Sequence, residues 1–254
     1  MISVCMATYN GERFIKQQID SILCQLNSED ELIISDDGST DGTLEIIASY
    51  NDDRIKLYHH QHPEYLNKIK TGKSFYYSTS NFENALKNAI GDYIFLSDQD
   101  DIWLPQKVVH CLSLLQENDC IVTNYQKIDS NGKIFQDFGF RKNPLHKSPL
   151  LNILDSHFRG CCMAFKADLL KIALPIPQNI IGHDYWLGVL ARKYCKVYYE
   201  LTPYIQSRWY TDSVSSPKKT SLYYKLSFRF TLWKEYLKRV NHINRLRGLN
   251  DRFN

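Results

Sequence analysis

Short apolar runs alternate with amphipathic segments over the first half of the chain. Apolar runs that end in turn residues predict buried strands, and apolar residues every three or four positions predict helices. We expect strands at residues 2–7, 31–35, 55–58, 93–97 and 120–125. We expect helices at residues 14–23, 43–49, 81–89, 106–116 and 185–193. The stretch 67–80 is polar and aromatic without a clear period, so we expect a loop there.

This alternation predicts an α/β fold with a Rossmann-like, mostly parallel sheet and helices on both faces. Three polar clusters follow predicted strands, at residues 8–12, 36–41 and 98–101. Ligands of such sheets bind beyond the carboxyl ends of the strands. The clusters therefore mark the expected binding site.

The composition is that of an ordinary globular protein, with 43% apolar residues among 254 and a formal net charge of +3. It excludes a disordered chain, a collagen-like repeat and a small disulfide scaffold. The charge is unevenly distributed, because residues 217–254 carry ten Lys or Arg and two Asp or Glu. An acidic body with a basic tail suggests an anionic surface as a partner.

The seven cysteines show no CxxC spacing and mostly fall in apolar stretches, which predicts buried thiols in a reducing compartment. The N-terminal segment lacks the features of a signal peptide, and no apolar run reaches 18 residues. We therefore expect a cytoplasmic protein, peripheral to a membrane.

The basic tail also carries an apolar stripe at helical spacing. It consists of Leu222, Leu226, Phe230, Trp233, Leu237, Val240 and Ile243. One interpretation is a helix that packs on the body through this stripe. The other is an interfacial helix on the anionic inner-membrane surface. Nucleic acid is not an expected partner, because no base-reading fold accompanies the charge.

The cluster at residues 98–101 places three carboxylates within four residues, which is costly unless a cation or a ligand compensates. Magnesium and manganese prefer such oxygen ligands and share them with phosphates. The alternative is a solvated turn in which Asp101 caps the next helix. The position at the end of a predicted strand favours the metal site.

Asp36 and Asp37 stand at the end of the second predicted strand. A turn that caps the following helix would explain one aspartate and the glycine after them. A carboxylate there could also accept a hydrogen bond from the N–H of a pyrimidine base. The spacing leaves both interpretations open.

Three segments together resemble family 2 glycosyltransferases: SVCMATYNG at residues 3–11, ISDDGSTDGT at 34–43 and LSDQDDIW at 96–103. The resemblance is strong over residues 1–125 and thinner beyond. It implies the GT-A fold, a nucleotide-sugar donor and inversion at the anomeric carbon. The sequence is particularly similar to bacterial enzymes of O-antigen or capsule synthesis, including a rhamnosyltransferase-like branch.

The resemblance also implies roles for individual residues. The nucleoside pocket would be lined by Thr8, Tyr9 and Glu12, with Asp37 on the pyrimidine ring and Asp36 beside it. Asp98 would contact the ribose or the sugar. Asp100 would hold Mn²⁺ or Mg²⁺ on the diphosphate, with Asp101 as a neighbour.

The general base implied by the resemblance is Asp184, within the segment IGHDYWL. An N-cap role is the alternative, because a predicted helix follows directly. His183 is expected to be a packed or exposed histidine without a catalytic role. Related enzymes carry a later histidine where this chain has Tyr210, and Arg208 is a candidate to neutralise the diphosphate.

Taken together, the sequence predicts a metal-dependent inverting transferase. It would move a hexose from a UDP- or dTDP-sugar to a lipid-linked saccharide. We expect a GT-A domain at residues 1–216, with a nucleotide-sugar half at 1–125 and an acceptor half at 126–216. Residues 217–254 would form the amphipathic tail. The alternative is an inactive nucleotide-sugar-binding partner protein.

Overall fold

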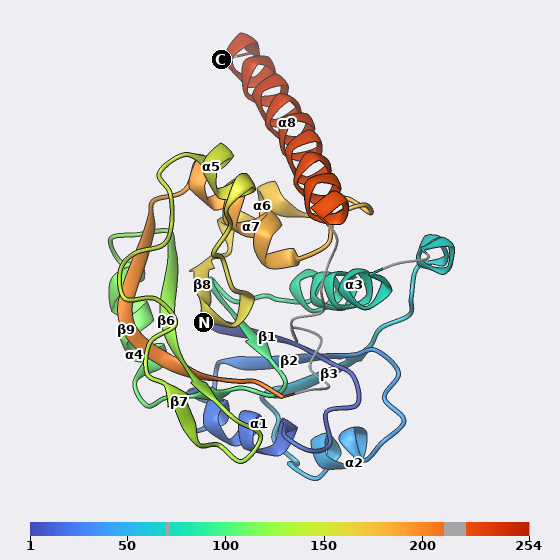
Figure 1. The fold of residues 1–254 in the computed structure, drawn as a ribbon, viewed down its shortest axis with the longest axis vertical. Coiled ribbons are helices and arrows are strands. Elements are labelled where there is room, and N and C mark those ends of the chain that lie inside the picture. Colours follow the sequence, from blue (N-terminus) through green and yellow to red (C-terminus); the bar gives the residue numbers. More distant parts are fainter. Residues whose placement is uncertain (70–71, 211–221, 254) are drawn as a thin grey trace.

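A computed structural model describes residues 1–69, 72–210 and 222–253, and its described strands form one sheet in the order β3-β2-β1-β4-β8-β6-β9-β5, with β7 paired to β6 (Figure 1). The strands are β1 Ile2–Thr8, β2 Glu31–Asp36, β3 Ile55–His59, β4 Tyr93–Asp98, β5 Ile102–Trp103, β6 Cys120–Ile128, β7 Ile134–Gln136, β8 Met163–Lys166 and β9 Val197–Arg208. The predicted boundary between the nucleotide-sugar half and the acceptor half, at residue 125, falls inside strand β6, so both halves share one sheet.

The N-terminal half of the sheet is parallel, since β1 pairs in parallel with β2 and β4, and β2 with β3. Strand β8 lies antiparallel between β4 and β6, while β6 and β9 run parallel. All residues of β2 are buried, as expected for a strand covered on both faces. The predicted α/β architecture is confirmed.

The helices are α1 Ile15–Leu23, α2 Thr43–Ala48, α3 Lys73–Lys87, α4 Lys107–Leu115, α5 Pro149–Leu154, α6 Asp168–Ala173, α7 His183–Tyr194 and α8 Leu222–Phe253. Two short 3₁₀ helices, η1 Glu64–Lys68 and η2 Gly160–Cys162, connect them. Helix α3 lies on one side of β1 and β2, and α1 and α2 lie on the other (Figure 1). The β strands are thus sandwiched between helices.

The loop predicted at residues 67–80 is wrong for its second half, because α3 begins at Lys73; residues 70–71 lie outside the described part. The helix lacks the expected apolar stripe because part of its buried face is polar, with Thr79, Ser80 and Asn81 enclosed. These side chains bond to other parts of the fold. Gly182 N–H donates to Thr79, for example, and Asn81 donates to the Thr8 carbonyl.

Residues 222–253 of the tail form the long helix α8, and one face of this helix packs on the body. It packs on the body through Leu232, Tyr236 and Ile243, and Arg239 donates to three carbonyls around α6. Most of the predicted stripe faces away from the body. The stripe therefore makes the packing face only at Val240 and Ile243 among its described residues. The predicted boundary at residues 216–217 and the side chain of Leu222 lie outside the described residues.

None of the helices described is long and apolar enough to cross a bilayer. The seven cysteines are free, and five of them are buried. The adjacent thiols of Cys161 and Cys162 lie 4.0 Å apart. The prediction of buried thiols is confirmed for these five, whereas Cys24 is exposed and Cys195 is half-buried.

Candidate active site

The parallel pairing brings the three polar clusters to one edge of the sheet. Thr8 lies opposite Asp36 in the register of β1 and β2, and Ala7 lies opposite Asp98 in that of β1 and β4. Asp184, in the first turn of α7, lies close enough to Asp98 to raise its pKa. The clusters and the proposed base therefore form one site.

The aspartates at the end of β4 have raised pKa values. Burial, followed by the charge of Asp101, raises the pKa of Asp98 to about 7. Burial and the neighbouring carboxylates raise the pKa of Asp100 and of Asp101 to about 6. Three acids held together at this cost favour either a proton or a cation among them.

Asp101 is the innermost of the three, with 2% of its surface exposed. Its Oδ1 accepts a hydrogen bond from the Arg208 backbone N–H at 3.0 Å, while Oδ2 is buried without a partner in the described residues. The alternative that Asp101 caps a helix is wrong, because β5 follows it and α4 begins at Lys107. An unpartnered buried carboxylate oxygen is consistent with a bound cation or proton.

Asp100 accepts a hydrogen bond from the Tyr210 hydroxyl at 2.8 Å. Tyr210 thus contacts the predicted metal ligand from the position where related enzymes carry a histidine. A phenol is a much weaker metal ligand than an imidazole at neutral pH, and burial raises the pKa of Tyr210 further. Tyr210 therefore orients the carboxylate.

The guanidinium of Arg208 is engaged within the protein. It donates to the carbonyls of Asp100, Asp129 and Ser130 and to the Gln17 side chain, and it lies 4.4 Å over the Phe14 ring. These bonds leave it poorly placed for the predicted contact with a diphosphate. Its observed role is to fix the backbone of the aspartate cluster.

Manganese or magnesium fits this donor set. Asp98, Asp101 and Cys161 offer ligand atoms within 4.8 Å of one another, and Asp100 is adjacent. Carboxylate oxygens suit these hard cations, whereas a thiol does not. The carboxylates are therefore the expected ligands, and Asp98 and Asp101 join Asp100 in the candidate set.

Arg159 is a site residue that sequence reasoning missed. Its guanidinium lies 4.4 Å over the Tyr125 ring, its Nε has no partner in the described residues, and its charge lowers the pKa of Asp98 and Asp101. It directly precedes Gly160, whose N–H donates to Asp184 at 3.3 Å. Only the fold places this cation beside the acids, which are distant in sequence.

Asp184 does not cap α7, so the N-cap alternative is wrong. The cap position is Gly182, and the Asp184 carboxylate accepts hydrogen bonds from the N–H groups of Gly160 and Tyr185. His183 is buried and stacks 3.7 Å from the Phe82 ring. Burial lowers its pKa to about 4, so it is a neutral packing residue, as predicted. The carboxylate is thus the better candidate base.

At the other end of the site, Asp36 and Asp37 have different surroundings. Asp36 is fully buried and its oxygens accept from Gly38 and Ser39 within a turn. The turn is confirmed for Asp36, but Asp36 does not cap the following helix, whose N-cap is Gly42. Both of its carboxylate oxygens are engaged within the turn, and its place in the donor site stays a prediction. The Asp37 carboxylate is held instead by His60 Nδ1 at 2.7 Å and His62 Nδ1 at 3.3 Å.

Both histidines were missed, because they follow a strand without a recognisable motif. His60 Nε2 also contacts Ser80 Oγ at 3.0 Å, and His62 stacks on Tyr77. The partners come from α3, which the sequence pattern did not predict at these residues. Asp37, His60 and His62 also form a second cluster of possible metal ligands in the described residues.

The first loop is tied to the acid cluster by Gln99. Its amide oxygen accepts from the Thr8 hydroxyl at 2.6 Å and from the Tyr9 N–H at 2.9 Å. Tyr9 is exposed, whereas Glu12 accepts from the N–H of Gly42. Thr8, Gln99 and Glu12 therefore tie the loops of the site together through hydrogen bonds, and the exposed Tyr9 side chain is accessible to a ligand.

Residues 3–172 match the sequence profile of glycosyl transferase family 2. The chain belongs to this family. Among curated relatives, the dTDP-rhamnosyl transferase RfbG of Shigella flexneri is 31% identical over 201 residues, which cover 74% of this chain and 65% of that protein. A glucosyltransferase of Escherichia coli, WfgD, is 32% identical over 133 residues, covering 52% of this chain and 48% of that protein.

A Rickettsia bellii glycosyltransferase of uncharacterized activity is 27% identical over 94% of this chain but only 34% of its own length. This family 2 chain thus spans between about a third and two thirds of the relatives named here.

Solved structures show the same fold. The Staphylococcus aureus TarS 1–349 complex with UDP-GlcNAc matches 91% of this chain and 66% of its own, with a TM-score of 0.65 and 18% identity. The mannosyltransferase PcManGT of Pyrobaculum calidifontis, solved with GDP-Man and Mn²⁺, matches 80% of this chain and 54% of its own, with a TM-score of 0.54 and 17% identity. The GT-A fold predicted from the sequence is confirmed.

Proposed function

We propose that this glycosyltransferase moves a hexose from a UDP- or dTDP-sugar to a saccharide on a polyprenyl diphosphate, with inversion, in bacterial O-antigen or capsule synthesis. The proposal rests mainly on one observation: Asp184 lies close to the Asp98–Asp101 cluster at the carboxyl edge of the sheet. Related proteins support the chemistry: RfbG is described as a dTDP-rhamnosyl transferase, and WfgD as acting on a diphosphoundecaprenol acceptor.

In this proposal Asp184 takes the proton from the acceptor hydroxyl as its oxygen attacks the anomeric carbon. The bond from that carbon to the diphosphate breaks, and the nucleoside diphosphate leaves with the electron pair. Asp98, Asp100 and Asp101 would hold Mn²⁺ or Mg²⁺, which would supply charge neutralisation at the leaving group. The charge of Arg159 stabilises the ionised forms of Asp98 and Asp101.

The nucleoside end uses Asp37 as the acceptor for the N3–H of uracil or thymine, with Tyr9 beside it. The acceptor would place the enzyme on the cytoplasmic face of the inner membrane. The deciding experiment is a panel of nucleotide sugars tested for hydrolysis with and without Mn²⁺. Metal-dependent release of UDP or dTDP supports the proposal, whereas saturable UDP binding without turnover would identify an inactive binding protein.

We expect the affinity for Mn²⁺ to rise as the pH increases from 5 to about 7 and then to level off. The acid cluster titrates near pH 6–7, so protons compete with the cation below that range. Without metal, these carboxyls keep their protons to a higher pH in the folded chain than in the unfolded chain. The free energy of unfolding should therefore fall as the pH rises from about 4 to 6–7 and change little above that range. Calorimetric titration and thermal unfolding would measure both trends. An affinity that is constant over this range would contradict a site made of these carboxylates.

Replacing His60 with glutamine should weaken UDP binding by about fivefold, because Asp37 loses a hydrogen bond worth roughly 1 kcal/mol in positioning. CDP binding should change less, since the N3 of cytosine has no hydrogen to donate to Asp37. The matched control is His59→Gln, an exposed neighbour at the end of β3. Equal losses for UDP and CDP would indicate a merely structural role.

A further inference from the structure

The outer face of α8 carries large apolar side chains that the fold leaves in solvent. Leu226, Phe230, Trp233 and Leu237 recur every three or four residues and are between 39% and 61% exposed. They form one stripe along the helix, separate from the face that packs on the body. A contiguous exposed apolar patch on a protein surface usually marks an interaction site.

Helix α5 carries further exposed apolar side chains. Leu150, Leu151 and Leu154 are each about half exposed, and α5 packs against α8. The two helices lie at the same end of the molecule, above the sheet (Figure 1). Seven large apolar side chains from two neighbouring helices thus gather at this end.

Basic residues flank the apolar stripe. Lys234, Lys238 and Arg245 are exposed on α8, and Lys147 precedes α5. Of these, Lys238 forms an ion pair with Glu235. Two copies of the chain that met through this surface would bring like charges together, which is unfavourable. Anionic phospholipid offers the complementary charge and an apolar interior.

We propose that α5 and α8 together form a docking surface for anionic phospholipid membranes, in which both helices insert apolar side chains and the lysines contact headgroups. The proposal rests on the proposed function in one respect, because a lipid-linked acceptor requires the site to face a membrane. The apolar stripe found in the sequence involves α8 only, so the role of α5 comes from the structure.

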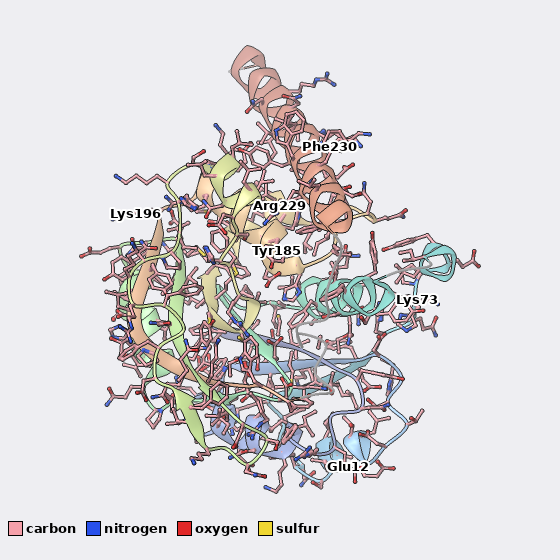
Figure 2. The ribbon with its side chains drawn as sticks, viewed as in Figure 1. Glu12, Lys73, Tyr185, Lys196, Arg229 and Phe230 are labelled. Atoms are coloured by element: carbon pink, nitrogen blue, oxygen red, sulfur yellow. The ribbon has the colours of Figure 1, made fainter. Side chains whose placement is uncertain are left out.

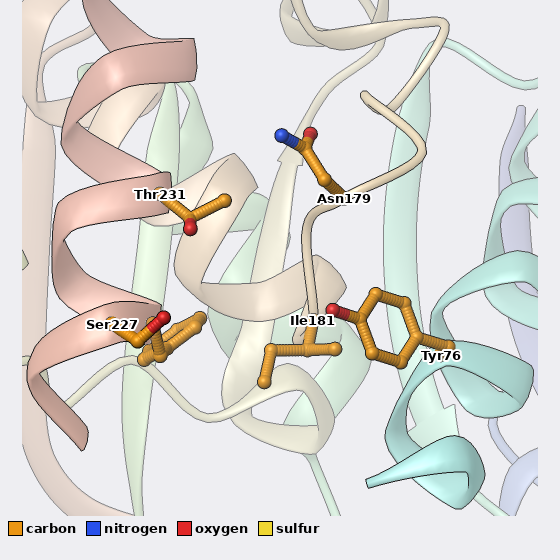
Figure 3. A pocket seen from close by; sticks show the side chains of 6 residues that line it. Tyr76, Asn179, Ile181, Ser227 and Thr231 are labelled. Atoms are coloured by element: carbon orange, nitrogen blue, oxygen red, sulfur yellow. The ribbon is translucent and has the colours of Figure 1, made fainter. Parts of the chain in front are cut away.

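Helix α8 also contacts α7, the helix that carries the proposed base. Phe228 of α8 packs edge-on against Tyr185, 5.4 Å between ring centroids, and Tyr185 directly follows Asp184. Tyr185 of α7 and Arg229 of α8 lie near this junction (Figure 2). A small pocket opens beside it, lined by Tyr76, Asn179, Ile181, Ser227, Phe228 and Thr231 (Figure 3). A saccharide on a docked lipid would therefore approach the catalytic edge from the membrane side.

The test is sedimentation of the full chain with vesicles of phosphatidylglycerol and phosphatidylcholine, compared with phosphatidylcholine alone. We expect binding to the anionic vesicles that weakens with salt, since exposed charges are screened. The double variants Phe230→Ser/Trp233→Ser and Leu150→Ser/Leu154→Ser should each reduce the partition coefficient by roughly tenfold or more. Phe135→Ser, an equally exposed phenylalanine on β7, is the matched control and should bind as the unmodified chain does.

Unchanged binding of both double variants would overturn the proposal. Failure of the α5 variant alone to weaken binding would also overturn it, by limiting the surface to α8. A chain that dimerises through these residues, without binding vesicles, would show a self-association surface instead. Hydrolysis of a soluble nucleotide sugar distinguishes this proposal from the proposed function. The double variants should retain this hydrolysis. If the unmodified chain bound vesicles but did not hydrolyse the nucleotide sugar, the proposed function would be disproved and the docking surface would not.

Discussion

Replacing Asp100 with asparagine should lower metal-dependent turnover of the nucleotide sugar by roughly a thousandfold, the rate equivalent of about 4 kcal/mol of transition-state stabilisation. The substitution preserves the side-chain volume and can still accept the Tyr210 hydrogen bond. It removes one negative charge from the cluster that would hold the cation. Activity assays over a range of Mn²⁺ concentrations would measure the loss.

The fold should not suffer from this change, because Asp100 is an acid with a raised pKa whose charge is unfavourable in the folded state. We expect an unfolding temperature equal to or slightly above that of the unmodified chain. Asp53→Asn, on an exposed loop, is the matched control and should keep full activity. An Asp100→Asn variant with full turnover would remove this residue from the metal site.

The strands of the parallel half could be predicted from sequence because their signal is local. Each is a short apolar run that ends in turn residues, and register in a parallel sheet then brings Thr8, Asp36 and Asp98 to one edge. The first half of helix α3, residues 73–80, is not predicted, for the converse reason, whereas the helix predicted at residues 81–89 overlaps its second half. Part of its buried face is made of Thr79 and Ser80, which serve the site rather than the core, so the apolar period is absent.

The site shows the same limit. A motif identifies residues that lie close in sequence, so Asp98, Asp100 and Asp184 were predicted. Arg159 acts on Asp98, and His60 holds Asp37, from distant segments that only the fold brings together. Hydrogen bonds in the fold also bear on roles that the sequence left open. The Asp36 carboxylate accepts hydrogen bonds within its own turn, and the Arg208 guanidinium donates to surrounding carbonyls.

The tail shows how periodicity can mislead. A stripe of apolar residues predicts one buried face, yet α8 has two apolar faces about the same axis. The face with Leu232 and Tyr236 packs on the body, and the face with Phe230 and Trp233 does not. A sequence pattern cannot tell which stripe meets the protein, because both satisfy the helical spacing.

Replacing Asp184 with asparagine should lower the rate of sugar transfer by about a hundredfold to ten-thousandfold. The affinities for UDP and Mn²⁺ should stay nearly unchanged. The amide keeps the size of the side chain, and its oxygen can still accept from Gly160 and Tyr185, but it cannot take a proton from the acceptor hydroxyl. Asp168→Asn is the matched control, since Asp168 also stands in the first turn of a helix but is exposed. Transfer rates and UDP titration on both variants separate chemistry from binding. Loss of UDP affinity together with transfer would show that Asp184 supports the donor pocket, and full transfer would exclude it as the base.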